Sequence, residues 1–333
     1  MLALSACAAP GEGERNADAD GALEAARVAW VGDTHVRYDG QWIPEAAVMT
    51  ARPLDVYSQT WPSGAASEVL LSYRRGASEI VRVPMALDRE HAGASGDNTQ
   101  WRATIPPAAL DGADVEYWVE ATGADGAALG EPAPHRVTPR DEVALGDGGW
   151  RMAGRGTFER EGDVLVARPG EALGLYWSTF PLPPDFELSL EFRLARADDN
   201  SGVVLRTPDP ARFGYENAAW VGVHYGLEVQ IDEIARPDGA AVHRTGAIYE
   251  QPGQTLDHRS PAPPGSWSRY VIRVVGQTYE VRLDGHLVSR LAWAGDPARP
   301  ERALPGSAAD PRFFGLQAHT GSVAFRDVRL RRL

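Results

Sequence analysis

The sequence predicts an all-β protein built from two sandwiches. Gly (35) and Pro (25) are plentiful among the 333 residues, which is typical of a chain with many turns. Short runs of alternating apolar and polar residues lie between these turns, and helical periodicity is almost absent. Chains of this kind bury their apolar faces by stacking antiparallel sheets. We therefore expect a small immunoglobulin- or fibronectin-like sandwich in residues 27–140 and a larger jelly roll in residues 143–333.

The first segment of the chain resembles a bacterial lipobox. Leu4-Ser5-Ala6-Cys7 has the pattern in which the Cys becomes the lipidated first residue of a mature lipoprotein, and the polar Gly/Ala/Asp-rich stretch after it resembles a flexible tether. The six residues before Cys7 are fewer than a signal peptide needs. We expect residues 1–26 to be a truncated lipoprotein signal and tether. The protein would then be extracytoplasmic, in the cell envelope or periplasm, and meet the membrane only through lipid.

The small sandwich is predicted by short alternating segments separated by turn signals. In "DVEYWVEATGADGA", residues 114–127, every second residue shares one face until an Asp-Gly turn. Its size and strand spacing are those of an immunoglobulin-like or fibronectin-type module. We expect this module to be a spacer. The alternative is an accessory sugar-binding role for Trp42, Trp61 or Trp101.

The larger sandwich is predicted by longer and cleaner strands. "FELSLEFRL", residues 186–194, alternates without interruption, and "RYVIRVVGQTYEVRLDGHLVSRL", residues 269–291, reads as hairpins that turn at Gly-Gln and Asp-Gly. In the final strand the apolar phase reverses, which predicts a bulge or a sheet crossing near Asp327. Two stacked antiparallel sheets of this size form a jelly roll.

Residue usage excludes several classes of function. The net charge of −13 argues against nucleic acid as a partner, because phosphate binding needs a basic surface. All 33 basic residues are Arg, so a Schiff-base lysine or a lysine general base is excluded. With Cys7 as the only cysteine, the folded part has no disulfide and no cysteine nucleophile. Phosphate loops, dinucleotide fingerprints and G-x-S-x-G elbows are absent from the sequence.

Two predicted strands carry polar faces that can bind a ligand. In "YGLEVQIDE", Glu228, Gln230 and Asp232 alternate with apolar residues, and in "GLQAHTG" Gln317 and His319 do the same. A concave sheet lined by carboxylate, amide, imidazole and aromatic groups suits a sugar, whose hydroxyls need donors and acceptors and whose ring stacks on aromatic faces. The alternative is a face that is simply solvated.

Six segments occur in the order and approximate spacing of one known family: "NSGVVLR", "GLEVQIDE", "RTGAIYEQP", "PGSWSRYVIRV", "LDGHLV" and "FGLQAHTGSVAFRDVRL". Through them residues 143–333 resemble the 3-keto-disaccharide hydrolase domain family, which includes 3-keto-glycoside 1,2-lyases and 2-hydroxy-glucal hydratases. The resemblance implies a concanavalin A-like lectin or glucanase fold and a carbohydrate ligand. It also implies a separate sugar 3-oxidoreductase that makes the ketone.

The chemistry implied by the resemblance is elimination followed by hydration. A ketone at carbon 3 acidifies the hydrogen on carbon 2, so a base can remove it and the glycosidic oxygen leaves carbon 1; water then adds, which gives net hydrolysis. An ordinary retaining glucanase is disfavoured, because Glu228 and Asp232 are about 13 Å apart along a strand, whereas retaining pairs stand about 5 to 5.5 Å apart. The alternative function is a non-catalytic, lectin-like surface lipoprotein.

Carried over to this sequence, the resemblance makes His319 and Glu228 the base and acid, in either order. His319, with Glu228 or Asp232, also offers nitrogen and oxygen ligands to a divalent metal ion, although no HExxH or paired-histidine spacing accompanies them. The expected substrate-binding residues are Gln230, Gln317, Arg206, Asn200, Tyr249 and Asp232. For Asp232 the alternative is a role in holding a loop. For Tyr249, stacking on the substrate and packing over the sheet edge are both open.

Overall fold

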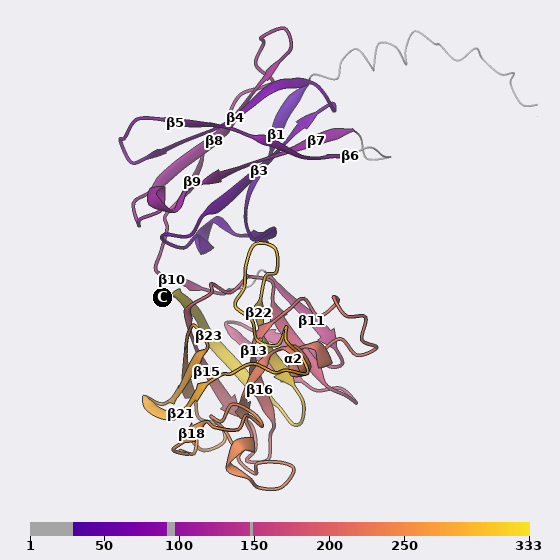
Figure 1. Ribbon diagram of the computed structural model, residues 1–333, viewed down its shortest axis with the longest axis vertical. Helices are drawn as coiled ribbons and strands as arrows, with labels where there is room; N and C mark the ends of the chain where they lie inside the picture. Colours follow the sequence, from indigo (N-terminus) through magenta and orange to yellow (C-terminus); the bar gives the residue numbers. More distant parts are fainter. Residues whose placement is uncertain (1–28, 92–96, 147–148) are drawn as a thin grey trace, which may run out of the picture.

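The computed structural model describes residues 29–91, 97–146 and 149–333, and nearly all of its regular structure is β (Figure 1). Four antiparallel sheets pair into two sandwiches that follow one another along the chain. The predicted all-β class, with a small sandwich before a jelly roll, is confirmed. The predicted lipidation of Cys7 and the tether at 1–26 lie outside the described residues. Within those residues no helix is long and apolar enough to cross a membrane.

The N-terminal sandwich consists of a five-stranded and a four-stranded sheet. In spatial order, the first sheet contains β2 (Gln41–Ile43), β1 (Trp30–Tyr38), β3 (Leu54–Trp61), β7 (Asn98–Ile105) and β6 (Ala86–His91). The second contains β5 (Val81–Pro84), β4 (Ala66–Arg75), β8 (Val115–Gly123) and β9 (His135–Val137). Two single-turn 3-10 helices accompany them, η1 (Glu45–Ala47) and η2 (Pro107–Ala109).

The C-terminal sandwich stacks a nine-stranded sheet on a five-stranded one. The larger sheet runs β12 (Thr157–Glu161), β13 (Val164–Arg168), β23 (Val323–Arg332), β15 (Phe186–Leu194), β19 (Ser268–Val275), β20 (Thr278–Leu283), β21 (His286–Ala292) and β18 (Thr255–Leu256), with β10 (Glu142–Ala144) beside β23. The smaller sheet runs β11 (Trp150–Gly154), β14 (Gly174–Ser178), β22 (Phe313–Ala318), β16 (Ser201–Thr207) and β17 (Leu227–Ile231). The helices here are α2 (Trp220–Tyr225) and η3 (Ala241–His243).

The strands form where apolar residues alternate, because alternate side chains of a strand point to one face. In β15, Phe186, Leu188 and Leu190 are fully buried between the two sheets. The β20–β21 hairpin turns at Asp284 and Gly285, both with positive φ, as a two-residue hairpin loop requires. The predicted bulge at Asp327 is confirmed: this residue has φ of 50°, and the register between β15 and β23 shifts there.

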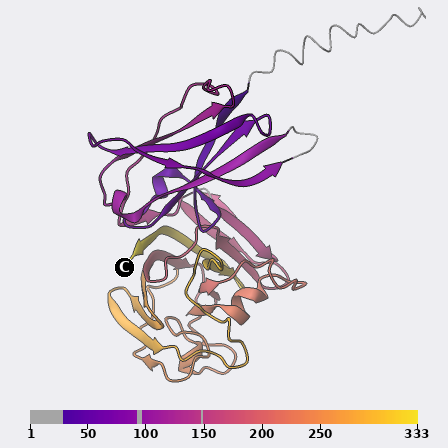
Figure 2. The same cartoon turned by 45° about the horizontal axis from the view of Figure 1, so that its top comes forward.

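An arginine buried at the junction fastens one sandwich to the other. The guanidinium of Arg52 lies 4.0 Å from the ring centre of Tyr38, pairs with Asp39 at 2.8 Å and donates to the Pro181 carbonyl at 3.0 Å. The Tyr38 ring meets Phe180 of the C-terminal sandwich edge to face. The N-terminal sandwich therefore rests on one end of the C-terminal one (Figure 2). The domain boundary between 140 and 143 stays a prediction.

The smaller C-terminal sheet is covered on both faces. Its inner face packs on the nine-stranded sheet through residues such as Leu227, Val229 and Leu316. On its outer face, α2 lies over Val204 and Leu175 and closes a second, smaller apolar cluster. Sequence analysis did not predict α2, which at six residues is too short to show helical periodicity. Beside α2, the rest of the outer face forms a cavity.

Candidate functional site

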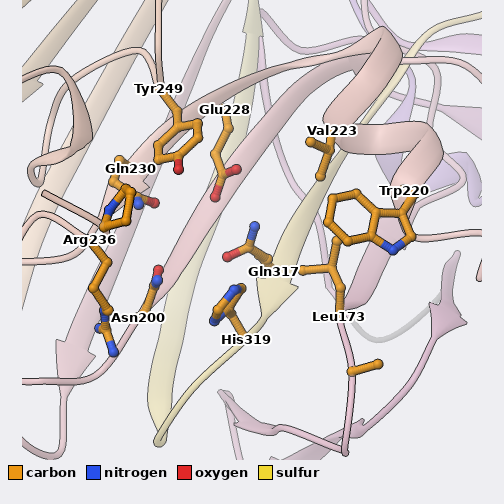
Figure 3. Close-up of a pocket in the computed structure, with 12 residues that line it drawn as sticks. Leu173, Asn200, Trp220, Val223, Glu228, Gln230, Arg236, Tyr249, Gln317 and His319 are labelled. Carbon is orange, nitrogen blue, oxygen red and sulfur yellow. The ribbon is translucent and has the colours of Figure 1, made fainter.

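The cavity on the outer face of the five-stranded sheet has a volume of about 420 Å³ (Figure 3). It is lined by Ala172, Leu173, Asn200, Trp220, Val223, Glu228, Gln230, Arg236, Pro237, Tyr249, Gln317 and His319. Six of the eight predicted site residues are in this set, contributed by strands far apart in sequence. Arg206 and Asp232 are not.

The outer face of the sheet is the floor of the cavity, and a glycine near the start of β16 lies between two strands that contribute to it. Gly202 pairs with Gln230 on β17, and on its other side the register that sets Val203 opposite Leu316 brings it beside Gln317. A Cβ at this position would overlap the Glu228 carboxyl. Sequence analysis missed Gly202, although a glycine inside a strand often marks a place where another group approaches closely.

The carboxyl of Glu228 is buried in this floor without a partner. Its side chain is only 9% exposed, and Oε1 has no hydrogen-bond partner among the described residues. Burial, with a smaller contribution from the charge of Glu250, raises the pKa of Glu228 to about 8. The group is therefore protonated at neutral pH.

Two amide oxygens beside Glu228 are also unpaired. Gln317 Oε1 and Asn200 Oδ1 are buried and have no hydrogen-bond partner among the described residues. Most buried polar atoms in native proteins have a partner, so three unpaired ones around a single cavity indicate a site that a polar ligand completes. Most of the polar groups predicted to share this face are thus buried at the cavity rather than fully solvated.

His319 stands at the mouth of the cavity. It follows the last residue of β22, its side chain is exposed, and Nδ1 lies 2.8 Å from the Thr320 hydroxyl. Partial loss of solvent, together with the positive charge of Arg236, lowers the pKa of His319 below its ordinary value. The imidazole is therefore neutral at neutral pH and able to accept a proton.

Asp232 serves Arg236 rather than a ligand, which corrects the sequence prediction. Asp232 is fully buried just after β17, and its two oxygens accept bonds from the Ile234 and Arg236 amides. The same carboxylate holds the Arg236 guanidinium at 2.9 Å, and this guanidinium also donates to the Asp198 carbonyl. The cation at the cavity is therefore Arg236, which sequence analysis missed because its position depends on the loop after the strand.

Arg206 also lies outside the cavity. The register of β16 shifts between Val204 and Thr207, and Arg206 itself has φ of 53°. This bulge breaks the alternation that would have put Arg206 on the same face as Val204. Its fully buried guanidinium donates to Gln277 at 2.9 Å and to Tyr279 at 3.1 Å, so its predicted role in substrate binding is wrong and its role is structural.

Tyr249 is held at the rim by an added edge segment. Residues 246–249 hydrogen-bond along β17, with the Tyr249 amide donating to the Glu228 carbonyl at 2.8 Å. Its ring packs against His243 at 5.0 Å, and His243 in turn contacts Asp238 at 2.7 Å. Tyr249 thus packs at the sheet edge and also lines the cavity, so both roles considered for it stay open.

The predicted metal ligands are not assembled. Among the described residues, no group of three or more His, Cys, Asp or Glu side chains is arranged to hold a metal ion. Asp232 is paired with Arg236 instead, so Glu228 and His319 have no third ligand beside them among the described residues.

The family model described as "3-keto-alpha-glucoside-1,2-lyase-like domain" matches residues 108–331. The chain belongs to this family. Membership confirms the resemblance inferred from the six segments, and it identifies a glycosidase-type domain with carbohydrate as its ligand class. The match of this 3-keto-α-glucoside-1,2-lyase-like domain begins before β8, in the N-terminal sandwich, and so extends upstream of the start predicted at 143.

Several solved structures are similar over about half of the chain. Two Parabacteroides distasonis proteins, provisionally assigned as glycosyl hydrolases, are 18% and 25% identical, with TM-scores of 0.44 and 0.41; the match covers 56% and 53% of this chain and 88% and 90% of theirs. The Bacillus subtilis carbohydrate-binding module CBM66 is 15% identical over 55% of this chain and 95% of that one, with a TM-score of 0.33. No curated protein sequence matches. At TM-scores this low, only the family match bears on function.

We predict that the buried carboxyl lowers stability as pH rises. The folded protein keeps the Glu228 proton up to a pH of about 8, whereas the unfolded chain releases it near its ordinary pKa of 4.5. Between these values the free energy of unfolding should fall by about 1.4 kcal/mol per pH unit relative to Glu228→Gln. Urea unfolding of both proteins from pH 4.5 to 8 measures this difference. The exposed Glu216→Gln is the matched control, and a Glu228→Gln effect that does not change with pH would contradict the prediction.

We also predict that Gly202→Ala acts through Glu228. The added methyl overlaps the carboxyl, so it should cost about 1–3 kcal/mol of stability and displace the acid from the cavity. In a Glu228→Ala background the same substitution should cost at least about 1 kcal/mol less, because the overlapping group is gone. A double-mutant cycle of unfolding free energies measures this coupling, and strictly additive effects would rule it out.

Proposed function

We propose that this domain cleaves glycosides that are already oxidised at carbon 3, by elimination across carbons 1 and 2 followed by hydration. The observation that carries the proposal is the pairing of opposite pKa shifts in one cavity. Glu228 holds a proton at neutral pH, and His319 is ready to accept one. Two titratable groups whose environments push their pKa values apart in this way are suited to act as acid and base at the same pH.

In this mechanism His319 is the base and Glu228 the acid. The imidazole takes the proton from carbon 2, and the electron pair of that C–H bond moves into an enolate with the carbon 3 ketone. The enolate then reforms the ketone, a double bond forms between carbons 1 and 2, and the glycosidic oxygen leaves carbon 1 with the proton of Glu228. Water next adds at carbon 1, Glu228 takes its proton, and His319 returns a proton to carbon 2.

The geometry is compatible with a sugar ring between these two groups. Glu228 lies on β17 and His319 directly follows β22, with β16 between these two strands, and Gln317 lies between the two side chains (Figure 3). The cavity of about 420 Å³ that both residues line leaves room for one pyranose. The Arg236 guanidinium and the amide of Asn200 line the same polar end, where they can donate to the enolate oxygen. One such donor typically contributes a factor of about 10²–10³ to the rate.

The alternative is a lectin-like module that binds sugar without cleaving it. A binding module needs paired hydroxyl contacts, and the amides Gln230 and Gln317 would supply them. It does not need a buried, protonated carboxyl that lowers the stability of the fold at neutral pH. The position of Glu228 therefore favours the enzyme.

We further propose an extracytoplasmic location, with lipid on Cys7 as the anchor. The lipobox-like segment supports this proposal. The chemistry also requires a sugar 3-oxidoreductase upstream, because elimination at carbon 2 depends on a ketone at carbon 3.

The central test is turnover in heavy water. Incubation with methyl 3-keto-glucoside or 3-keto-trehalose should release 3-keto-glucose that carries deuterium at carbon 2, and mass spectrometry should detect the 1,2-unsaturated intermediate. His319→Ala should abolish both signals, whereas His286→Ala, an exposed histidine away from the cavity, should retain them. Samples without enzyme correct for spontaneous exchange. No turnover of any ketoside, with measurable binding of the unoxidised sugar, would assign the cavity to the lectin-like alternative.

The acid role of Glu228 predicts a particular pH profile. Because the reactive form is protonated, kcat/KM should fall as the pH rises through about 8. On the acid side it should fall as His319 gains a proton, at a pH below the ordinary value for imidazole. In release of the leaving group, kcat/KM of Glu228→Gln should fall at least about 100-fold on an alkyl 3-keto-glucoside but much less on 4-nitrophenyl 3-keto-glucoside, whose leaving group needs no proton. Equal losses on both substrates would mean that Glu228 is not the acid.

A further inference from the structure

The cavity has a polar end and an apolar end, and Glu228 stands between them. In Figure 3, Leu173, Val223 and Trp220 lie on one side of the Glu228 carboxyl, and Arg236 lies on the other with Gln230 and Asn200. Ala172, which precedes Leu173 in the chain, also lines the cavity. Gln317 and His319 lie between the two ends, and none of the sugar-binding groups described above lies at the apolar end. The function of the apolar end is therefore not accounted for by sugar binding.

Trp220 is exposed but firmly held. It is the first residue of α2, and its side chain is 43% exposed. The helix lies close to the sheet because Gly222 has no side chain: a Cβ there would be 2.9 Å from Leu175 Cδ2. The indole is 5.7 Å from the ring of His224, which hydrogen-bonds the Tyr215 hydroxyl at 2.8 Å. A large aromatic side chain fixed at a cavity rim in this way is a preformed stacking surface.

The apolar end offers almost nothing to a hydroxyl. Of the four side chains there, only the indole of Trp220 has a polar atom. A second sugar would bring several hydroxyls into this end, and each one that loses water without gaining a partner weakens binding by roughly tenfold or more. An aromatic or aliphatic group loses no hydrogen bonds and gains contact with the indole and with Leu173 and Val223.

We propose that Ala172, Leu173, Trp220 and Val223 form the subsite for the leaving group, and that it takes an aromatic or otherwise apolar aglycone rather than a second sugar. The orientation rests on the proposed function, since the group that protonates the leaving oxygen must lie between the sugar and the aglycone. Glu228 has this position. The substrate class is then a 3-keto-glycoside of a phenol or an apolar alcohol.

Equilibrium binding tests the subsite independently of catalysis. Benzyl and methyl glucosides with an intact hydroxyl at carbon 3, each as both anomers, are titrated into the full protein by calorimetry. We expect the benzyl glucoside to bind at least about tenfold more tightly than the methyl glucoside. Trp220→Ala should bring the two within about twofold of each other, and Val223→Thr, which keeps the shape but adds a hydroxyl, should reduce the preference.

A tryptophan elsewhere supplies the control. Trp267 packs between Arg193 and Arg326 and does not line the cavity, so Trp267→Ala should keep the tenfold preference. Equal binding of benzyl and methyl glucosides to the unmodified protein would overturn the subsite. Tighter binding of a glucosyl-glucose than of the benzyl glucoside, lost in Trp220→Ala, would assign this end to a second sugar and overturn the aglycone class.

Turnover separates this proposal from the proposed function. Methyl 3-keto-glucoside has no aglycone body to fill the apolar end, so its cleavage reports on the acid and base alone. Failure to cleave it, with the benzyl preference intact in binding, would overturn the function and retain an apolar subsite. If methyl 3-keto-glucoside is cleaved but the protein shows no preference for benzyl, either in binding or in kcat/KM for benzyl 3-keto-glucoside, the function is retained and the apolar subsite is overturned.

Discussion

The burial of an unpaired carboxyl above a strand glycine is the constraint on which the site depends. Glu228 has a raised pKa chiefly because protein replaces water around it and no donor stabilises its charge. Each neighbour contributes to that isolation. Gly202 leaves room for the carboxyl, residues 246–249 cover the outer edge of β17, and α2 closes the outer face of the sheet beside it. The rest of the sandwich holds these three elements in place.

The same constraint explains why the cation of the site is tied down elsewhere. A free guanidinium next to Glu228 would favour the carboxylate and lower its pKa. Arg236 instead shares its charge with buried Asp232 and donates to a backbone carbonyl, so it lines the cavity at a distance from the acid. The loss of solvent lowers the pKa of His319 most, the charge of Arg236 lowers it further, and the charge of Asp232 acts in the opposite direction. Arg236 thus helps to keep the base neutral at the pH at which Glu228 is protonated.

Alternation in the sequence predicts the strands, the hairpin turns, the bulge at Asp327 and the side chains that share the cavity floor, because all of these depend on local patterns. The sequence predictions are wrong where a local irregularity of the backbone sets the direction of a side chain. A bulge turned Arg206 into the core, and the end of a strand turned Asp232 toward its own loop. Gly202 and Arg236 were missed because their roles come from neighbours on other strands or loops. Trp220 lies on a helix too short to give a periodic signal.

The raised pKa of Glu228 favours both the elimination and the hydration in the proposed reaction. While the carboxyl of Glu228 is protonated it can release the leaving oxygen, and once it has given up the proton it is a stronger base than an ordinary carboxylate. It then stands beside carbon 1, at the point where water must be deprotonated for the addition. An aglycone that leaves as a phenol needs little protonation by the acid, because a phenolate is a good leaving group. For such a substrate the deprotonation of water by Glu228 is the more demanding step. The stability lost by burying Glu228 would then serve mainly the hydration step, which is the step that distinguishes a net hydrolase from a lyase.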